Sequence, residues 1–424
     1  MLRLRDVENA VLVSPWLNWL RRPGTWLWAA LMMGALLRLY LVIFTQGTYD
    51  VIIWKQHATG VRDLGLIGYY HSNVQMNHPP FIAMAESLLL RLADATGVPY
   101  RILLRAPFAL LDAGTTALLF VLLRQSPWRY AAAAAYWLNP LTVILSAYHG
   151  NTDSSVAFFV ILSVWLLSRQ ASLAAGAALG VGLWIKLPVV LSVPALVLFI
   201  RDRRKQLWFL AAIGITAIST YLPVLALDAN AVRKNVFGYH GEILQTTGGD
   251  PVWGPRAMMA SFLPDSGKWP ASCVTLAEFY VDNSWRICLG LLLVLAWLRR
   301  SCGSTGELCA TLAAGYVLFY GFTDYWAFQY FAWSAPFWFL LRPEFFVPAL
   351  ALAGGYIYAL YWYLCGNPWL RGPWDFLGHP HWPPVVTAFR NLAMLFFFAG
   401  ACACLFSAAR NAFTRRITAQ KSGG

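Results

Sequence analysis

The chain has 424 residues, of which 59% are hydrophobic and only 12% are charged. Soluble domains carry about 25% charged residues, so this composition excludes an ordinary soluble protein and requires lipid as solvent for the apolar surface. A net charge of +13 would suggest nucleic-acid binding in a soluble protein. Here the basic residues lie largely between hydrophobic runs, as the positive-inside rule requires of cytoplasmic loops. We therefore expect a multi-pass protein that contacts membrane lipid and no nucleic acid.

The hydrophobic runs predict an all-α polytopic protein, because a helix needs about 20 mostly apolar residues to cross a bilayer. Several runs are short or adjoin one another, and together they predict a bundle of about twelve spanning helices. The runs lie at 26–45, 103–123, 130–147, 154–168, 170–186, 188–200, 207–227, 285–299, 307–322, 328–342, 345–363 and 387–408.

Basic clusters predict the orientation, because Lys and Arg gather in cytoplasmic loops. With the spans as predicted, the clusters on one side are Arg21, Arg22, Arg124, Arg129, Arg169, residues 201–205, Arg299, Arg300, Arg342, Arg415 and Arg416. Both termini are then inside, and the first span is expected to stay because no small-residue cleavage site follows it. The predicted division is a cytoplasmic segment 1–25, a transmembrane module 26–342, C-terminal transmembrane helices 343–408 and a cytoplasmic tail 409–424.

The stretch 79–96 is apolar but is not expected to span, since it carries Glu86, Arg91 and Asp94, which are costly in hydrocarbon. A crossing here would also move every later basic cluster to the wrong side. We expect an amphipathic helix on the outer interface. It belongs to a long first outer loop with interfacial helices at 46–102, and further outer loops are predicted at 228–284 and 364–386.

The polar chemistry of the chain gathers on the outer side. All seven histidines map to outer loops or outer ends of spans, at His57, His71, His78, His149, His240, His379 and His381. The inner side has short basic loops, and no P-loop or GxGxxG motif follows a strand pattern. We therefore expect chemistry outside the membrane, without ATP or a nucleotide sugar.

Asp50 stands where the first span emerges, in Thr48-Tyr49-Asp50. A partly desolvated carboxylate that still reaches outer substrates suits a general base, whereas an ordinary loop carboxylate or helix cap is the alternative. Further along, Asn77-His78-Pro79-Pro80 fixes two φ angles. Either Asn77 caps the helix that follows, or the rigid loop aims Asn77 and His78 at a substrate.

Charged residues also lie within or beside the predicted spans. Arg105 and Asp112 are seven positions apart in the second predicted span and indicate either a structural ion pair or a lipid-headgroup contact. The third predicted span ends in His149-Gly150-Asn151-Thr152-Asp153, where Asp153 either caps the next helix or lines a cavity with His149 and Asp50. Lys186 lies where two apolar runs meet on the outer side, so we expect it to snorkel or to bind phosphate.

Aromatic and amide side chains cluster in later outer segments. They occur at Tyr239-His240-Gly241-Glu242, at Trp253-Gly254-Pro255-Arg256 and at Asp324–Tyr330, which includes Gln329. Rings stack on the C–H faces of sugars and amides bond their hydroxyl groups, although interfacial anchoring is an equally good explanation of each motif.

The seven cysteines show no zinc-site spacing. A Cys273–Cys365 bridge between outer loops is one option for two of them. His379-Pro380-His381 offers two metal ligands on a proline-rich loop, which is weak support for a metal site.

Taken together, these motifs resemble the GT-C superfamily of membrane glycosyltransferases that use polyprenyl-phosphate sugars. The resemblance rests on the outer Asp50, Tyr69-Tyr70 followed by His78-Pro79-Pro80, Arg105 with Asp112, and Asn139-Pro140 followed by His149-Gly150-Asn151-Thr152-Asp153. It covers roughly residues 30–340. The pattern is similar to bacterial polyprenyl-phosphate-dependent mannosyltransferases, to the dolichyl-phosphate-glucose glucosyltransferases of the endoplasmic reticulum and to the first GPI mannosyltransferase.

The resemblance implies a GT-C-type bundle with a catalytic module at 26–342 and Asp50 as its catalytic acid. It matches Arg105 and Asp112 to a polar pair, His149 and Asp153 to the outer motif, and Gln329-Tyr330 to a Gln-Tyr that opens a late span. Substrate contacts are expected from Trp54, Tyr70, Asn77, His78, Arg105, His149, Asp153, Lys186, Arg256, Gln329 and Tyr330. The first loop has no second acid beside Asp50, so the sequence does not support a metal-binding acidic pair there. A divalent metal stays an open option without support, and no cofactor is assigned.

The implied reaction is the inverting transfer of a hexose, with mannose favoured, to a lipid-linked or glycan acceptor on the outer face. Asp50 would be the general base, and Lys186, helped by Arg105 or Arg256, would stabilise the departing phosphate. The expected location is a bacterial inner membrane with a periplasmic site, or the endoplasmic reticulum membrane in a eukaryote. A lipid or solute transporter is the alternative, but it would need polar residues through mid-membrane, where Asp112 is the main candidate, and transporters often have two similar halves.

Overall fold

The computed structural model describes residues 23–422 except 240–242, 263–269, 302 and 341–342. Within these residues the chain is helical, with no β-strand and one isolated bridge between Gln245 and Pro251. The predicted all-α class is therefore confirmed. Arg21, Arg22, His240, Glu242 and Arg342 lie outside the described residues, as does predicted segment 1–22 of the cytoplasmic N-terminus.

The helices follow one another from α2 to α17. Their bounds are α2 (Pro23–Phe44), α3 (Tyr49–Ser72), α4 (Pro80–Thr96), α5 (Tyr100–Leu122), α6 (Arg129–Leu138), α7 (Pro140–Val143), η2 (Ile144–Tyr148), α8 (Ser154–Ser168), α9 (Ser172–Ile185), η3 (Leu187–Ser192), α10 (Val193–Phe199), α11 (Arg203–Val232), η4 (Arg233–Phe237), α12 (Pro255–Phe262), α13 (Ala271–Leu298), α14 (Thr305–Phe322), η6 (Phe328–Tyr330), α15 (Phe331–Trp338), α16 (Pro343–Cys365) and α17 (Pro384–Ser422).

Six described helices are long and apolar enough to cross a membrane, rather than the twelve predicted. They are Gly24–Phe44, Tyr100–Leu122, Arg203–Phe237, Ala271–Leu298, Val347–Cys365 and Pro384–Thr414, and each coincides with a predicted span. These six make the protein a multi-pass membrane protein.

Most of the other predicted spans are short or broken in the structure; α14, an unbroken helix of 18 residues over the predicted span 307–322, is an exception. Run 130–147 is divided where Pro140 lacks an N–H group and Asn139 Oδ1 accepts from the backbone N–H of Leu141 at 2.8 Å. Helices α8 and α9 have 15 and 14 residues, which is about 21–23 Å at 1.5 Å per residue and short of the hydrocarbon thickness. Hydropathy alone counted these buried segments as spans.

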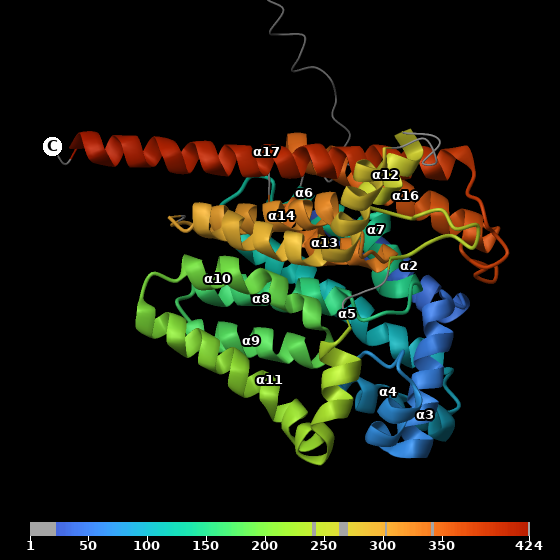
Figure 1. The fold of residues 1–424 in the computed structure, drawn as a ribbon. Helices are drawn as coiled ribbons and strands as arrows, with labels where there is room; N and C mark the ends of the chain where they lie inside the picture. The colour runs from blue at the N-terminus through green and yellow to red at the C-terminus, as the bar shows by residue number, and fades with distance from the viewer. Residues whose placement is uncertain (1–22, 240–242, 263–269, 302, 341–342, 423–424) are drawn as a thin grey trace, which may run out of the picture.

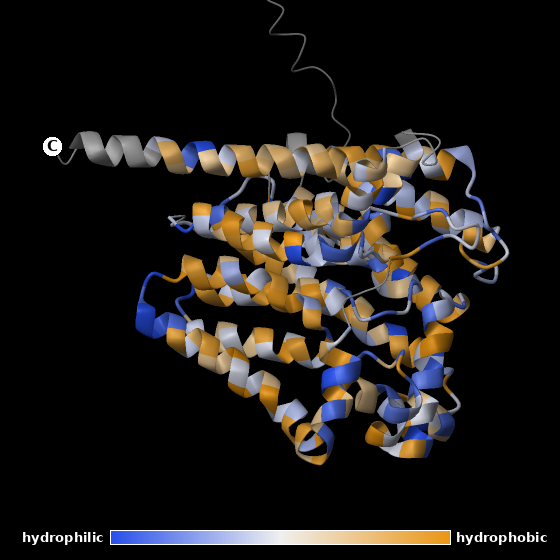
Figure 2. Ribbon diagram, viewed as in Figure 1, coloured by the Kyte–Doolittle hydropathy of each residue, from blue (hydrophilic) through white to orange (hydrophobic). Residues whose placement is uncertain are grey.

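The two ends of the helical bundle differ in character (Figure 1). The long helices run side by side, with the turn between α10 and α11 at the left end of the view and α3 and α4 at the right end. Figure 2 shows that the α10–α11 turn is hydrophilic, and it carries the exposed basic run 201–205. The basic turn and the helices that follow Asp50 therefore lie at opposite ends, as the predicted topology requires.

The stretch 79–96 forms a helix, α4, as predicted. Its Glu86 is buried and accepts a hydrogen bond of 2.6 Å from the Tyr100 hydroxyl group at the start of α5. Burial raises the pKa of Glu86 to about 7, and the hydrogen bond from Tyr100 opposes that rise. Glu86 thus joins α4 to α5, while the position of α4 at the membrane interface stays a prediction.

The predicted pairing of Arg105 with Asp112 is wrong. Asp112 Oδ2 instead accepts from Arg38 of α2 at 2.8 Å, and Asp112 Oδ1 accepts from the Tyr136 hydroxyl group at 2.9 Å. Arg38 lies over the Trp137 ring at 3.7 Å. This buried pair ties α2, α5 and α6 together, and the sequence could not show that Arg38 rather than Arg105 turns toward Asp112.

The suggested Cys273–Cys365 bridge is also wrong, since both cysteines are free. Cys273 is exposed near the start of α13, whereas Cys365 is buried at the end of α16. The Cys365 sulfur instead lies 2.8 Å from the Tyr148 hydroxyl oxygen.

Candidate active site

Asp50 lies in the first turn of α3, where Thr48 caps the helix. The hydroxyl oxygen of Thr48 accepts from the backbone N–H of Asp50 at 3.3 Å and donates to the carbonyl oxygen of His149 at 2.7 Å. A helix N-terminus favours a negative charge. The cap therefore places the Asp50 carboxylate in a favourable field and fixes it beside the segment that contains His149.

That segment brings two side chains onto one carboxylate oxygen. Asp50 Oδ2 accepts from Asn151 Nδ2 at 2.5 Å and lies 3.1 Å from His149 Nε2. The backbone turns at Gly150, whose φ is +80°, and a Cβ atom there would lie 2.3 Å from Val51 Cγ2. Only glycine fits this left-handed turn, so the sequence His149-Gly150-Asn151 is what wraps both side chains around Asp50.

Asp50 Oδ1 is left open to a ligand. Among the described residues no side chain or backbone group donates to this oxygen, and the Asp50 side chain is 29% exposed. The carboxylate is therefore oriented through one oxygen, while the other has no described donor and the side chain is partly exposed.

Lys186 completes the cluster from the junction of α9 and η3. Its Nζ atom donates to Asp153 Oδ2 at 2.6 Å and to Asn151 Oδ1 at 3.1 Å. Asp153 is fully buried, and its Oδ1 accepts from Trp333 Nε1 of α15 at 2.5 Å. Asp153 occupies the N-cap position of α8, as one alternative expected, but its side chain makes no capping hydrogen bond and bonds Lys186 and Trp333 instead.

The charges around Asp50 keep it ionised. Burial raises the pKa of Asp50, but interaction with His149, the hydrogen bonds from His149 and Asn151, and the charge of Lys186 together lower it below its usual value. The carboxylate is therefore ready to accept a proton at neutral pH.

Aromatic rings and neutral histidines stand next to this cluster. His78 stacks on Trp54 with ring centroids 4.0 Å apart, and Tyr70 donates to the His78 carbonyl oxygen at 2.7 Å. Burial, Lys186 and His57 lower the pKa of His78 well below its usual value, while Asp50 opposes them. Burial lowers the pKa of His57 to about 4. Trp54, Tyr70 and His78 thus form a rigid uncharged wall.

Asn77 does not act as the helix cap that the sequence allowed. The cap position of α4 is Pro79, without a side-chain capping bond. Asn77 is half-buried beside His78. The second alternative, a contact with substrate, stays a prediction.

Arg105 is not available to a substrate in this structure. It is fully buried, and its guanidinium group donates to the carbonyl oxygens of Val42 and Thr45 at 2.9 and 2.8 Å and to the Thr45 hydroxyl oxygen at 3.0 Å. It also donates to the Tyr148 carbonyl oxygen at 3.3 Å. Arg105 therefore joins the chain just before Asp50 to the segment that contains His149. It does not face a ligand, which corrects its predicted role as a substrate contact.

The later predicted residues approach the cluster to different degrees. The Tyr330 ring stacks on that of Trp333 with centroids 4.1 Å apart, and Trp333 in turn donates to Asp153. The neighbouring Gln329 is 9% exposed. Arg256 is exposed at the start of α12, where its backbone N–H donates to Asp324 Oδ1 at 3.0 Å. No described contact joins Arg256 to Asp50 or Lys186.

Sequence reasoning missed Asn151, Trp333 and Tyr361 as members of the cluster. Asn151 was visible within the His149–Asp153 motif, where an amide between an imidazole and an acid is a usable signal. Tyr361 hydrogen-bonds His149 Nδ1 through its hydroxyl group, but it lies in the apolar helix α16 and carries no local signal.

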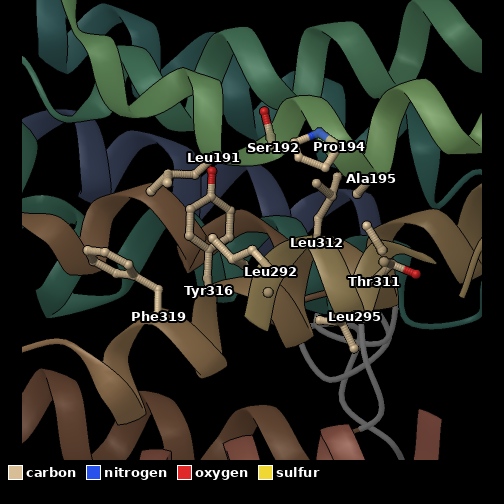
Figure 3. Close-up of a pocket in the computed structure, with 12 residues that line it drawn as sticks. Leu191, Ser192, Pro194, Ala195, Leu292, Leu295, Thr311, Leu312, Tyr316 and Phe319 are labelled. Carbon is tan, nitrogen blue, oxygen red and sulfur yellow. The ribbon is translucent and has the colours of Figure 1, made fainter. Parts of the chain in front are cut away.

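An apolar groove opens beside the cluster between α10, α13 and α14 (Figure 3). It is lined mainly by Leu191, Pro194, Leu292, Leu312, Tyr316 and Phe319. Leu191 belongs to η3, which begins directly after Lys186, and the Phe319 ring lies 5.7 Å from that of Trp333. The groove and the charged cluster are therefore neighbours.

The described residues contain no group of three or more His, Cys, Asp and Glu placed to hold a metal ion. His381 of the proline-rich loop lies 3.3 Å from Asp250 through its Nδ1 atom, and the His379 ring packs against Tyr363 at 4.5 Å. The two histidines thus have separate protein partners.

Comparison with known proteins identifies the family. Residues 78–321 match the sequence model of glycosyltransferase family 87. A search of curated proteins found no match. The matched range contains His149, Asn151, Asp153 and Lys186, whereas Asp50 and Tyr361 lie on either side of it. Since the match covers more than half of the 424 residues, and six described helices suit a membrane, this membrane protein belongs to glycosyltransferase family 87.

Proposed function

We propose that the protein transfers a hexose, with mannose favoured, from a polyprenyl-phosphate sugar to a lipid-linked or glycan acceptor on the outer face of the membrane. Family membership makes the chain a glycosyltransferase, and its apolar helices make it a membrane protein. The donor, the acceptor and the roles of individual residues are inferred from the cluster around Asp50.

The proposed step is a single inverting displacement. A hydroxyl oxygen of the acceptor attacks the anomeric carbon, and its proton passes to Asp50 Oδ1. The bond between the anomeric carbon and the phosphate oxygen breaks, and the polyprenyl phosphate leaves with the electron pair. A positioned general base contributes about 10²- to 10⁴-fold to such a reaction.

The observation that carries this proposal is the asymmetry of the Asp50 carboxylate. Oδ2 is held by His149 and Asn151, while Oδ1 has no donor among the described residues and the side chain is 29% exposed. A base must keep one oxygen free for the incoming proton, and Asp50 does so while its other oxygen fixes the orientation of the carboxylate.

Lys186 is proposed to stabilise the departing phosphate. An ammonium group has three donors, and among the described contacts Nζ uses two, to Asp153 and Asn151. The third can bond a phosphate oxygen in a site where the Lys186 side chain is only 12% exposed. Preorganised donors of this kind contribute about 10²- to 10³-fold each, and the exposed Arg256 is a further phosphate contact in the proposal.

The apolar groove is proposed to take the first isoprenoid units of the donor. It begins next to η3, so a phosphate on Lys186 would point its tail toward Leu191 and Phe319. The sugar would then lie toward Asn77 and His78 on one side and Gln329 and Tyr330 on the other. The fully buried Trp54 and Tyr70 would support His78 from behind. We place this site in the periplasm of a bacterial inner membrane, or in the lumen of the endoplasmic reticulum in a eukaryote.

The test is transfer by purified full-length protein from radiolabelled polyprenyl-phosphate mannose, glucose or arabinose to candidate lipid acceptors. We expect Asp50→Asn to abolish transfer while Asp63→Asn, an exposed acid on the same helix paired with Arg62, keeps it. Near-wild-type turnover by Asp50→Asn would remove Asp50 as the base. Movement of the labelled donor across vesicles without cleavage would favour the transporter instead.

A further inference from the structure

We propose that Tyr361 is a positioning residue for the transfer reaction: its hydroxyl group donates to Nδ1 of His149 and so holds the Nε2–H of that ring on the Asp50 carboxylate. The inference rests on the proposed role of Asp50 as the base. It assigns a function to α16, which lies beyond the range that matches the family.

A continuous chain of side-chain contacts supports this role. Asp50 Oδ2 lies 3.1 Å from His149 Nε2, and His149 Nδ1 is hydrogen-bonded to the Tyr361 hydroxyl group. His149 is 2% exposed and Tyr361 is fully buried. Three elements far apart in sequence, α3, the end of η2 and α16, therefore meet through one imidazole ring.

The hydrogen positions follow from what each group can donate. An ionised Asp50 can only accept, so the proton of the Asp50–His149 bond is on Nε2. With Nε2 protonated, a neutral ring leaves Nδ1 as an acceptor, and the Tyr361 O–H then donates to it. This arrangement satisfies all three groups.

The alternative, a doubly protonated ring, leaves a hydrogen stranded. Nδ1–H would then donate to the Tyr361 oxygen, and the Tyr361 proton would need another acceptor. Among the described residues His149 is the hydrogen-bond partner of Tyr361. Leaving a buried O–H unpaired is unfavourable, so Tyr361 selects the neutral ring with Nε2–H.

Packing fixes the Tyr361 ring in place. Its centroid lies 4.8 Å from Trp374 and 5.9 Å from Tyr148, both at steep interplanar angles, and 6.3 Å from Phe328. A ring held on several sides can set the orientation of its neighbour, as a partner on the second nitrogen does for other functional histidines.

The charged and titratable groups that face Asp50 come from each adjoining element. They are His149 after η2, Lys186 before η3, His78 before α4 and Tyr361 on α16. Interaction with His149 is among the causes that lower the pKa of Asp50. Loss of the Tyr361 hydroxyl group frees the imidazole ring to turn away from Asp50, which should weaken the hydrogen bond from Nε2–H and raise the pH at which Asp50 takes up its proton.

The test compares Tyr361→Phe with Tyr356→Phe in the full-length protein, using whichever labelled donor the wild type turns over. Tyr356 is a matched control, because it lies on the same helix, is fully buried and has no hydrogen-bond partner for its hydroxyl oxygen among the described residues. We expect Tyr361→Phe to lower kcat about tenfold, the effect of one lost hydrogen bond, and to shift the acid limb of the pH profile upward. Tyr356→Phe should change neither.

A double-mutant cycle with His149→Gln separates positioning from packing. If Tyr361 acts through His149, adding Tyr361→Phe to His149→Gln should cause no further loss of kcat or shift of the profile. Equal losses in both backgrounds, or a Tyr361→Phe enzyme that behaves like Tyr356→Phe, would overturn the inference.

Nitrogen NMR of the wild-type protein labelled with ¹⁵N-histidine gives a readout that needs no Tyr361 variant. The resonances of His149 are assigned by their loss in His149→Gln. We expect a neutral ring protonated on Nε2, and a ring protonated on Nδ1 would contradict the inference. If Asp50→Asn is inactive but Tyr361→Phe behaves like the wild type, only the inference about Tyr361 fails. If Asp50→Asn is active, the proposed role of Asp50 as the base fails.

Discussion

Two buried cation–carboxylate clusters in this protein use similar residues in different ways. In the bundle cluster, Asp112 accepts from Arg38 on one oxygen and from Tyr136 on the other, and its side chain is 3% exposed. In the site cluster, Asp50 accepts from His149 and Asn151 on one oxygen and is 29% exposed. Charge alone would not separate them. The free oxygen of Asp50 does, since a saturated carboxylate can stabilise helix packing but cannot accept a proton from a substrate.

The largest expected effect is on activity and separates the two acids directly. Asp50→Asn should reduce transfer by about 10²- to 10⁴-fold and leave thermal stability in detergent close to that of the wild type. Asp112→Asn should instead lower stability. The measurements are initial transfer rates and melting curves of both variants, and a reversed pattern would break the comparison.

Breaking the bundle pair should cost stability in a way that removing both partners does not. Arg38→Met leaves Asp112 buried without its cation, which we expect to cost about 3–5 kcal/mol. The double variant Arg38→Met with Asp112→Leu should recover much of this loss, since well-packed apolar residues can replace a buried ion pair. Denaturation in mixed micelles measures the difference, and a double variant as unstable as Arg38→Met would contradict it.

Lys186 should matter for rate more than a surface lysine does. Lys186→Met combined with Asp153→Asn avoids an unpaired buried carboxylate, and we expect kcat to fall about 10²- to 10³-fold. Lys205→Met is the control, because Lys205 is exposed in the basic turn at the other end of the bundle. Equal rates in the two enzymes would remove Lys186 from phosphate stabilisation.

The smallest expected effect is on the pH profile. Because the pKa of Asp50 lies below its usual value, the wild-type enzyme should stay active until the pH falls below the ordinary range of an aspartate. The base is lost only as the pH falls through the lowered pKa, so His149→Gln, which removes causes of that lowering, should move the acid limb to higher pH. Profiles of kcat/KM measure the shift, and a downward movement would contradict the assigned electrostatics.

Local sequence patterns predicted where the helices lie better than which side chains contact one another between helices. Hydropathy predicted the six long spans and α4. The clustering of polar residues at span ends pointed to a shared site for Asp50, His149, Asp153 and Lys186. Twelve spans were too many, because hydropathy does not distinguish a lipid-facing helix from a short buried one. The partner of Asp112 was missed, since a sequence does not show which of two arginines turns inward.

The Asp50–His149–Tyr361 contact has a consequence for biosynthesis. Helices enter a membrane in the order of synthesis, so Asp50 and His149 are in place well before α16 follows. Until Tyr361 arrives, the imidazole ring has a partner on one nitrogen only. A nascent chain that still lacks its penultimate long helix would therefore expose an unfinished site, and the enzyme would be assembled only when insertion is nearly complete.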